Sequence, residues 1–318
     1  MKLPPLVDPF LAAILGTVAL ASLAPAPPRV VSVLHTVTLF AVALLFFLHG
    51  AKLSREAIVA GVGHARLHGV VFALTFLGFP LVGVALRPVA LPLLGDTLYD
   101  GVLFLCALPA TVQSAIVFTS IAGGNVAAAV CSASASSVIG VFVTPLLVRL
   151  LLGASSGGVS ITAVRDIALQ VLLPFAVGHL SRPRTLPYLE RARSVVRFVD
   201  QGVIVLVVYV VFCDAVRSGL WHAAPPRAFA SLFAVCGVLL AIMLLVSRHL
   251  ARVLGFERAD EITIVFGSSK KSLATGIAMA NVLLVGRPLG LLVLPLMLFH
   301  QLQLMACTVL ARRYAKSP

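Results

Sequence analysis

Long apolar segments alternate with short polar segments along the whole chain. Each apolar segment is close to the roughly 20 residues that a helix needs to cross a bilayer. Proline and glycine clusters such as Pro25–Pro28 and Pro225–Pro226 separate several of them. We therefore predict an all-α membrane protein. Its ten spans are expected at about 8–24, 30–50, 68–87, 98–121, 125–152, 163–181, 197–219, 228–250, 260–285 and 288–311.

Composition excludes the soluble classes. The chain has 318 residues, of which 60% are hydrophobic and 11% are charged, and its mean hydropathy is +1.09. A soluble domain of this size could not bury so much apolar surface. The net charge of +13 does not indicate nucleic-acid binding, because the cations lie in short loops with no soluble domain to present them. The cysteines lie inside apolar segments, with no metal-binding spacing.

The positions of Lys and Arg predict the orientation. With the N-terminus in the cytoplasm, 15 of the 24 cations fall in inside segments and 7 in outside segments; two lie mid-span. This asymmetry follows the positive-inside rule. We expect an inner-membrane protein with both termini cytoplasmic.

The two halves of the chain show a weak likeness. The second and seventh spans each end in an aromatic and apolar run, a polar break and a cation, and the fifth and tenth spans each contain a proline. Five spans in each half would give the halves opposite topologies. We therefore expect one membrane domain over 1–318, built from inverted repeats at about 8–152 and 163–311.

The ninth span contains the most informative feature. Residues 267–272, Gly-Ser-Ser-Lys-Lys-Ser, interrupt an otherwise apolar helix. At about 1.5 Å per residue, Lys270 lies roughly 20 Å from Glu257, near the middle of a bilayer core about 30 Å thick. A charge at that depth is unfavourable, and broken backbone there is tolerated only against protein or a watery cavity. One of Lys270 and Lys271 is expected to meet a substrate, although a structural cation that holds the broken ends together is the alternative.

A matching interruption is expected in the fourth span. Pro109 removes a backbone donor, and Thr111, Gln113 and Ser114 follow it at once. These side chains can coordinate a ligand, or they can satisfy the freed backbone groups of an ordinary proline kink. Interrupted segments at matching positions of two halves are typical of a transporter's binding site.

Other polar residues lie deep in the predicted spans. Asn125 precedes a run of small residues and serines at 131–137, which either packs helices together or lines the cavity. His300 is either a proton relay or a satisfied histidine between helices. The candidate substrate- or ion-binding residues are Thr111, Gln113, Ser114, Asn125, Ser268, Ser269, Lys270, Lys271, Ser272 and His300. We expect no catalytic residue, no cofactor and no confident metal ligand.

Several segments resemble the bile acid:sodium symporter family, and in particular its SBF-like branch. They are FFLHGAKLSREAI, LPATVQSAIVFTSIAGGNVAAAV, VTPLLV, GSSKKSLATGIAMA and LPLMLFHQLQL, in the family's order along nearly the whole chain. The resemblance implies ten helices in two inverted repeats, a panel domain and a core domain. It also implies that the fourth and ninth helices are broken and cross at the substrate site.

The ninth span departs from the sodium-coupled relatives. When their Glu-x-Gly-x-Gln-Asn-Ser run is aligned with this span, Val265 stands at the position of the glutamate and Lys270 at that of the asparagine. Only Ser114 still matches a hydroxyl ligand of sodium. The family resemblance implies sodium coupling, whereas these residues argue against it; sodium, protons or no coupling ion stay open.

The sequence thus predicts a secondary transporter of a small organic anion. No phosphate-binding loop for ATP and no hydrolase motif occurs in it. A membrane regulator or scaffold that keeps the fold without transport is the alternative. Substrate, direction and oligomeric state stay undetermined.

Overall fold

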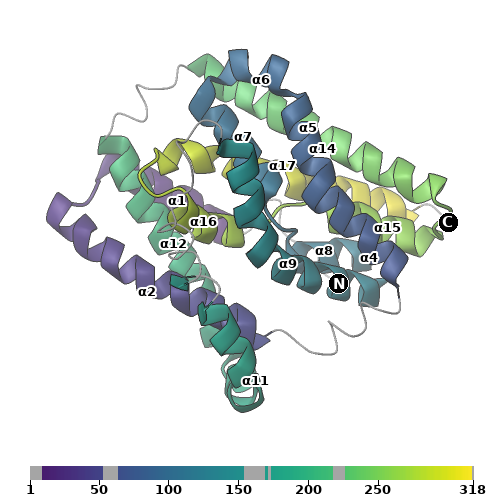
Figure 1. Ribbon diagram of the computed structural model, residues 1–318, viewed down its shortest axis with the longest axis horizontal. Helices are drawn as coiled ribbons and strands as arrows, with labels where there is room; N and C mark the ends of the chain where they lie inside the picture. Colours follow the sequence, from purple (N-terminus) through teal and green to yellow (C-terminus); the bar gives the residue numbers. More distant parts are fainter. Residues whose placement is uncertain (1–8, 53–63, 154–168, 171–172, 218–225, 317–318) are drawn as a thin grey trace. The chain divides into compact units, whose positions relative to one another are not determined.

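The computed structural model describes residues 9–52, 64–153, 169–170, 173–217 and 226–316. All regular elements in these ranges are helices (Figure 1). Six helices are long and apolar enough to cross a membrane, and one bent pair of helices makes a seventh candidate span. The all-α membrane class predicted from the sequence is therefore confirmed, whereas ten spans remain a prediction.

The chain divides into two compact units, and each unit takes segments from both halves of the sequence. Unit 1 contains residues 1–53, 159–225 and 277–291, and unit 2 contains residues 54–158, 226–276 and 292–318. The divisions after residues 276 and 291 fall inside helices, within α16 (Leu273–Leu283) and α17 (Leu289–Lys316).

Unit 1 is built on four helices: α1 (Pro9–Leu23), α2 (Pro28–Lys52), α11 (Leu173–Arg191) and α12 (Arg193–Arg217). The backbones of α2 and α11 touch at two glycines. A Cβ added to Gly50 would lie 2.0 Å from the carbonyl oxygen of Phe175, and one added to Gly178 would lie 2.1 Å from that of Phe47. Small residues at such crossings are typical of membrane helices because they let backbones approach closely.

Unit 2 contains the remaining helices. A span of α4 (Ala65–Ala73), a π-helical turn η1 (Leu74–Gly78) and α5 (Phe79–Ala85) is followed by α6 (Arg87–Leu94), α7 (Asp96–Ala107), α8 (Val112–Ile121) and α9 (Val126–Leu152). The second half contributes α14 (Pro226–Val253), α15 (Arg258–Ser268), the start of α16 and most of α17.

Two elements differ from the predicted spans. Residues 88–94 were expected to lie in a loop, but they belong to α6, which has Arg87 at its first position and Pro92 inside it. The sixth span was predicted to end at residue 181, whereas α11 continues to Arg191 through Pro183 and Pro187. Hydropathy does not detect helices that carry this many cations and prolines. The first part of that predicted span lies mainly outside the described residues.

Both predicted interruptions are present. The fourth span bends by 65° between α7 and α8 (Figure 1). The ninth span is interrupted between Ser268, where α15 ends, and Leu273, where α16 begins. Both predicted break regions therefore contain non-helical backbone.

A charged cluster fixes the first turns of α15. The buried Glu261 accepts from Arg252 at 2.9 Å and from the hydroxyl of Tyr314 at 3.0 Å, and Arg248 lies 3.5 Å away. These partners come from α14 and α17. The start of the broken ninth span is thus tied to two neighbouring helices.

The α2–α11 crossing predicts a specific sensitivity to side-chain volume. We expect Gly50→Ala and Gly178→Ala each to destabilise the protein by about 1–3 kcal/mol, since the added methyl group forces two backbones apart. Gly202→Ala in α12 is the matched control, because an added Cβ there meets no atom within 4 Å. Thermal unfolding of the three variants in detergent measures the difference, and equal melting temperatures would contradict the close crossing.

Candidate functional site

The two helix breaks meet inside unit 2. The backbone N–H of Ser272, next to the start of α16, donates to the carbonyl oxygen of Pro109 at 3.0 Å. The fourth and ninth spans therefore touch at their interruptions.

The side chain of Lys271 occupies a cage of backbone carbonyl oxygens. Its Nζ donates to the carbonyls of Leu108 at 2.6 Å, Thr75 at 2.8 Å and Cys106 at 2.9 Å. The ring of Phe79 lies 4.1 Å from the same nitrogen, in the range of a cation–π contact. Lys271 is fully buried. The three N–H donors of an ammonium match the three acceptors in number.

Cys106 and Leu108 offer their carbonyls because α7 ends early. In a continuous helix, Cys106 would accept from the N–H of Ala110, but that N–H donates to Ser136 at 3.1 Å. The carbonyl of Ala107 accepts from Thr144 at 2.9 Å, and that of Pro109 accepts from Ser272. Each carbonyl from 106 to 109 thus has a partner from α9 or from the ninth span. Since an unpaired backbone group in an apolar interior is costly, this complete pairing stabilises the break.

The third carbonyl is released by the π-helical turn before Pro80. In an α-helix, Thr75 would accept from the N–H of Phe79, but that N–H donates to Leu74, five residues back. The next residue is Pro80, which has no N–H to donate. The carbonyl of Thr75 therefore has no helical donor and accepts from Lys271 instead.

The backbone of Lys271 is fixed by Gln303 of α17. The side-chain oxygen of Gln303 accepts from the Lys271 N–H at 2.8 Å, and its side-chain nitrogen donates to the Lys271 carbonyl at 3.0 Å. The same nitrogen lies 2.8 Å from Nδ1 of His300. His300 therefore belongs to the layer that positions Lys271.

Lys270 has a different environment although it is equally buried. Its Nζ has no hydrogen-bond partner within the described part of the chain. The nitrogen lies 4.7 Å from the ring centre of Phe118 in α8 and 5.3 Å from that of Phe266 in α15. These aromatic faces attract a cation, but they stabilise it far less than hydrogen bonds to carbonyl oxygens do. The ammonium group of Lys270 is therefore incompletely compensated in this structure.

The serines of the break form hydrogen bonds with the nearby backbone. Ser268 and Ser269 are fully buried and donate to the carbonyls of Ile264 and Val265, one turn earlier in α15. The hydroxyl of Ser272 accepts from the N–H of Thr275 at 3.3 Å and caps the N-terminus of α16.

The remaining candidates lie around α8 and α9. Thr111 precedes α8 without a side-chain cap, Gln113 is exposed, and Ser114 donates to the Thr111 hydroxyl at 3.4 Å. The N-terminus of α8 therefore keeps a positive dipole end that no side chain of its own caps. Asn125 caps α9 and donates to Asp260 at 3.0 Å, so it joins the α8–α9 turn to α15.

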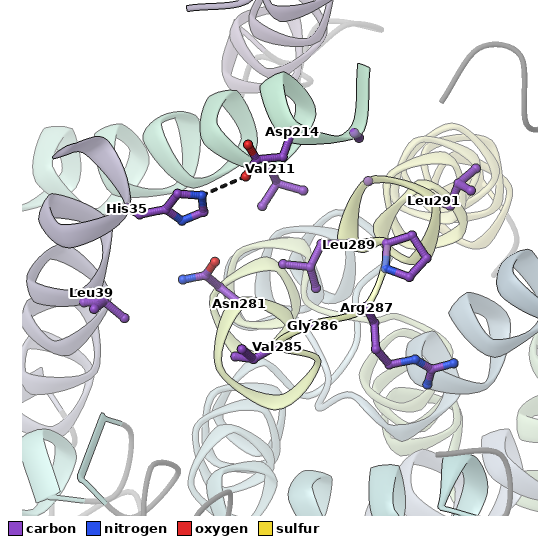
Figure 2. A pocket seen from close by; sticks show the side chains of 13 residues that line it. His35, Leu39, Val211, Asp214, Asn281, Val285, Gly286, Arg287, Leu289 and Leu291 are labelled. Atoms are coloured by element: carbon purple, nitrogen blue, oxygen red, sulfur yellow. Dashed lines mark hydrogen bonds and ion pairs between the residues drawn. The ribbon is translucent and has the colours of Figure 1, made fainter. Parts of the chain in front are cut away.

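Unit 1 contains a separate cavity of about 450 Å³. His35 and Asp214 point toward each other at its edge, 2.7 Å apart, and Asn281 lies on the facing helix (Figure 2). Leu39 and Val285 contribute to its mainly aliphatic lining. None of the ten candidate residues lines this cavity.

Sequence reasoning missed four groups that build the Lys271 cage and its support. The carbonyl of Thr75 is exposed by Pro80, which was visible inside the third span but was not interpreted. Ser136 and Thr144 lie on α9; the sequence predicts helix packing or cavity lining for the serine run that contains Ser136, and not pairing with the fourth-span break. Gln303 lies one helical turn after His300 and is not among the predicted site residues.

The two lysines predict opposite effects on stability. We expect Lys271→Met to lower stability by about 2–5 kcal/mol, because it leaves three buried carbonyls without their donor. We expect Lys270→Met to leave stability unchanged or to raise it, since it removes a buried charge that has no hydrogen-bond acceptor among the described residues. Melting temperatures of the purified variants test this, and a Lys270→Met variant less stable than Lys271→Met would contradict the geometry.

Comparison with known proteins supplies the family. Residues 8–316 match the model of the SBF-like CPA transporter family. The chain is 55% identical over 312 residues to an uncharacterized protein of Pseudomonas aeruginosa, PA2026, covering 98% of this chain and 94% of that protein. It is 52% identical to the protein named "Putative symporter YfeH" of Escherichia coli, covering 99% and 95%.

A vertebrate relative is similar over most of its length. The chain is 30% identical over 278 residues to sodium/bile acid cotransporter 7 of Rattus norvegicus, covering 86% of this chain and 82% of the rat protein. The apolar helices and these relatives agree that this is an integral membrane transport protein and not an enzyme. The chain belongs to the SBF-like CPA transporter family.

Proposed function

We propose that the protein is a secondary transporter of a small organic anion and that Lys270 binds the anion. The observation that carries this proposal is the fully buried Lys270 Nζ, which has no hydrogen-bond acceptor among the described residues. A buried cation is retained in a membrane protein only when something compensates for it. A transient anionic substrate supplies that compensation.

The break before α8 also favours the binding of an anion near Lys270. The N-terminus of α8 has no side-chain cap from Thr111, so its N–H groups and positive dipole end favour a negative ligand. Phe118, which contacts Lys270, lies one helical turn after Ser114 on the same face of α8. We therefore assign Thr111, Gln113 and Ser114 to the same anion site. Asn125, Ser268, Ser269, Ser272 and His300 support it.

Access to Lys270 requires a conformational change. The side chain is enclosed by Phe118 and Phe266, whose ring centres lie 5.9 Å apart in the core of unit 2. An anion reaches the ammonium only when this packing opens. Alternating access, with opening toward one side of the membrane at a time, meets that requirement.

We propose the complete architecture as ten spans in two inverted repeats. Unit 1 combines α1 and α2 with α11 and α12, the first two spans of each half, and unit 2 combines the later spans of both halves. The distribution of cations supports an orientation with both termini in the cytoplasm, which we propose together with a location in the inner membrane.

Loss of the Lys270 charge should abolish transport without unfolding the protein. We expect Lys270→Met to weaken anion binding by roughly 30-fold or more, the loss of a buried charge pair. Uptake into proteoliposomes is measured with a panel of labelled carboxylates, sulfonates and a bile acid. Lys316→Met, an exposed cation on α17, is the matched control.

Two outcomes would redirect the assignment. If Lys270→Met keeps wild-type uptake, Lys270 is not the anion site. The unit 1 cavity then becomes the competing location. Leu39→Trp fills this cavity, and Val37→Trp is the control because Val37 lies nearby but outside the lining. If the wild-type protein moves no member of the panel, the regulator or scaffold alternative gains support.

Sodium should have little effect on uptake. Val265 lies where sodium-coupled relatives have a carboxylate, and it is fully buried in α15. A sodium ion about 4 Å from an ammonium would be repelled by about 4 kcal/mol at an effective dielectric constant near 20. Uptake at a fixed membrane potential is compared in sodium and choline media. A steep dependence on sodium would contradict the prediction and leave Ser114 as a candidate ligand.

A further inference from the structure

We propose that the Lys271 cage is a monovalent-cation site that the tethered ammonium of the lysine itself occupies. Removing the side chain then opens a site that takes a free ammonium or a similar small cation. This site depends on the fold alone and does not require that the protein transports an anion.

The chemistry of the cage favours a single positive charge. All three acceptors are backbone carbonyl oxygens, and they lie 2.6, 2.8 and 2.9 Å from Nζ. Rings of backbone carbonyls are how proteins replace the hydration shell of a monovalent cation, whereas Ca²⁺ and Mg²⁺ sites generally include carboxylates. The face of Phe79 at 4.1 Å adds a further attractive surface for a cation.

The cage is formed by the backbone and therefore does not depend on the lysine side chain for its acceptors. The Cys106 and Leu108 carbonyls are freed at the end of α7, where the last carbonyls carry the negative end of the helix dipole. The Thr75 carbonyl is freed by the π-helical turn η1 and by Pro80. Because Lys271 ties η1 to the α7–α8 break, its ammonium does the structural work of a bound ion.

Chemical rescue tests the proposal. Lys271→Ala is purified in choline chloride, and its thermal unfolding is followed as choline is exchanged for ammonium, methylammonium, potassium or sodium at constant ionic strength. A cation that binds only the folded state raises the melting temperature progressively with its concentration. We expect ammonium to restore most of the melting temperature that Lys271→Ala loses, while choline, which is too large for the cage, restores none.

Two proteins serve as controls. The wild type should not respond, because its cage is filled. Lys270→Ala removes an equally buried lysine from the adjacent position, but its Nζ contacts no carbonyl cage in the described structure, so ammonium should not stabilise it. A response of Lys271→Ala alone supports the site. Equal responses of all three proteins, or no response of Lys271→Ala to any of the four cations, would overturn it.

A second measurement, the yield of purified protein, applies if Lys271→Ala folds poorly. Membranes are solubilised in ammonium or in choline medium, and the yield of monodisperse protein is compared. A higher yield in ammonium for Lys271→Ala, and not for Lys270→Ala, supports the cage. Equal yields in the two media contradict it.

Discussion

The pairing of backbone polar groups in an apolar interior is the constraint on which this structure depends. Breaking a membrane helix releases carbonyls and N–H groups that water cannot satisfy. Here the fourth span is broken after Ala107, and every carbonyl from Cys106 to Pro109 finds a donor outside its own helix. The break in the ninth span supplies most of these donors, so the two interruptions stabilise each other.

The adjacent lysines combine a structural contact with the proposed binding role in one break. Lys270 and Lys271 both lie in the non-helical backbone between α15 and α16, and their side chains enter different environments. Lys271 enters the carbonyl cage, and Gln303 fixes its backbone. Lys270 faces two phenylalanine rings with no acceptor in the described structure. The first lysine stabilises the geometry that leaves the second one available.

Much of the fold and part of the site could be predicted from the sequence. Hydropathy finds the long apolar helices, and Pro109 and the Gly-Ser-Lys run mark the two breaks, because each is a local departure from a helical pattern. The helix α6 and the end of α11 could not be found this way, since they combine cations and prolines. The acceptors for Lys271 were also missed. Freeing the Thr75 carbonyl depends on a π-helical turn, and recruiting Ser136, Thr144 and Gln303 depends on tertiary packing.

Under the proposed function, a tethered ammonium limits which group can drive transport by this protein. A bound ion can enter and leave, so its binding free energy can bias one conformation over another. The ammonium of Lys271 stays at the junction through its own chain and can bias conformations only if its contacts change between them. Its contacts are backbone carbonyls of unit 2. If unit 2 moves as one body, those contacts persist and Lys271 contributes stability alone. Under the proposed function, the charge that can gain and lose a partner during a cycle is then that of Lys270, so any coupling acts through the anion that binds there.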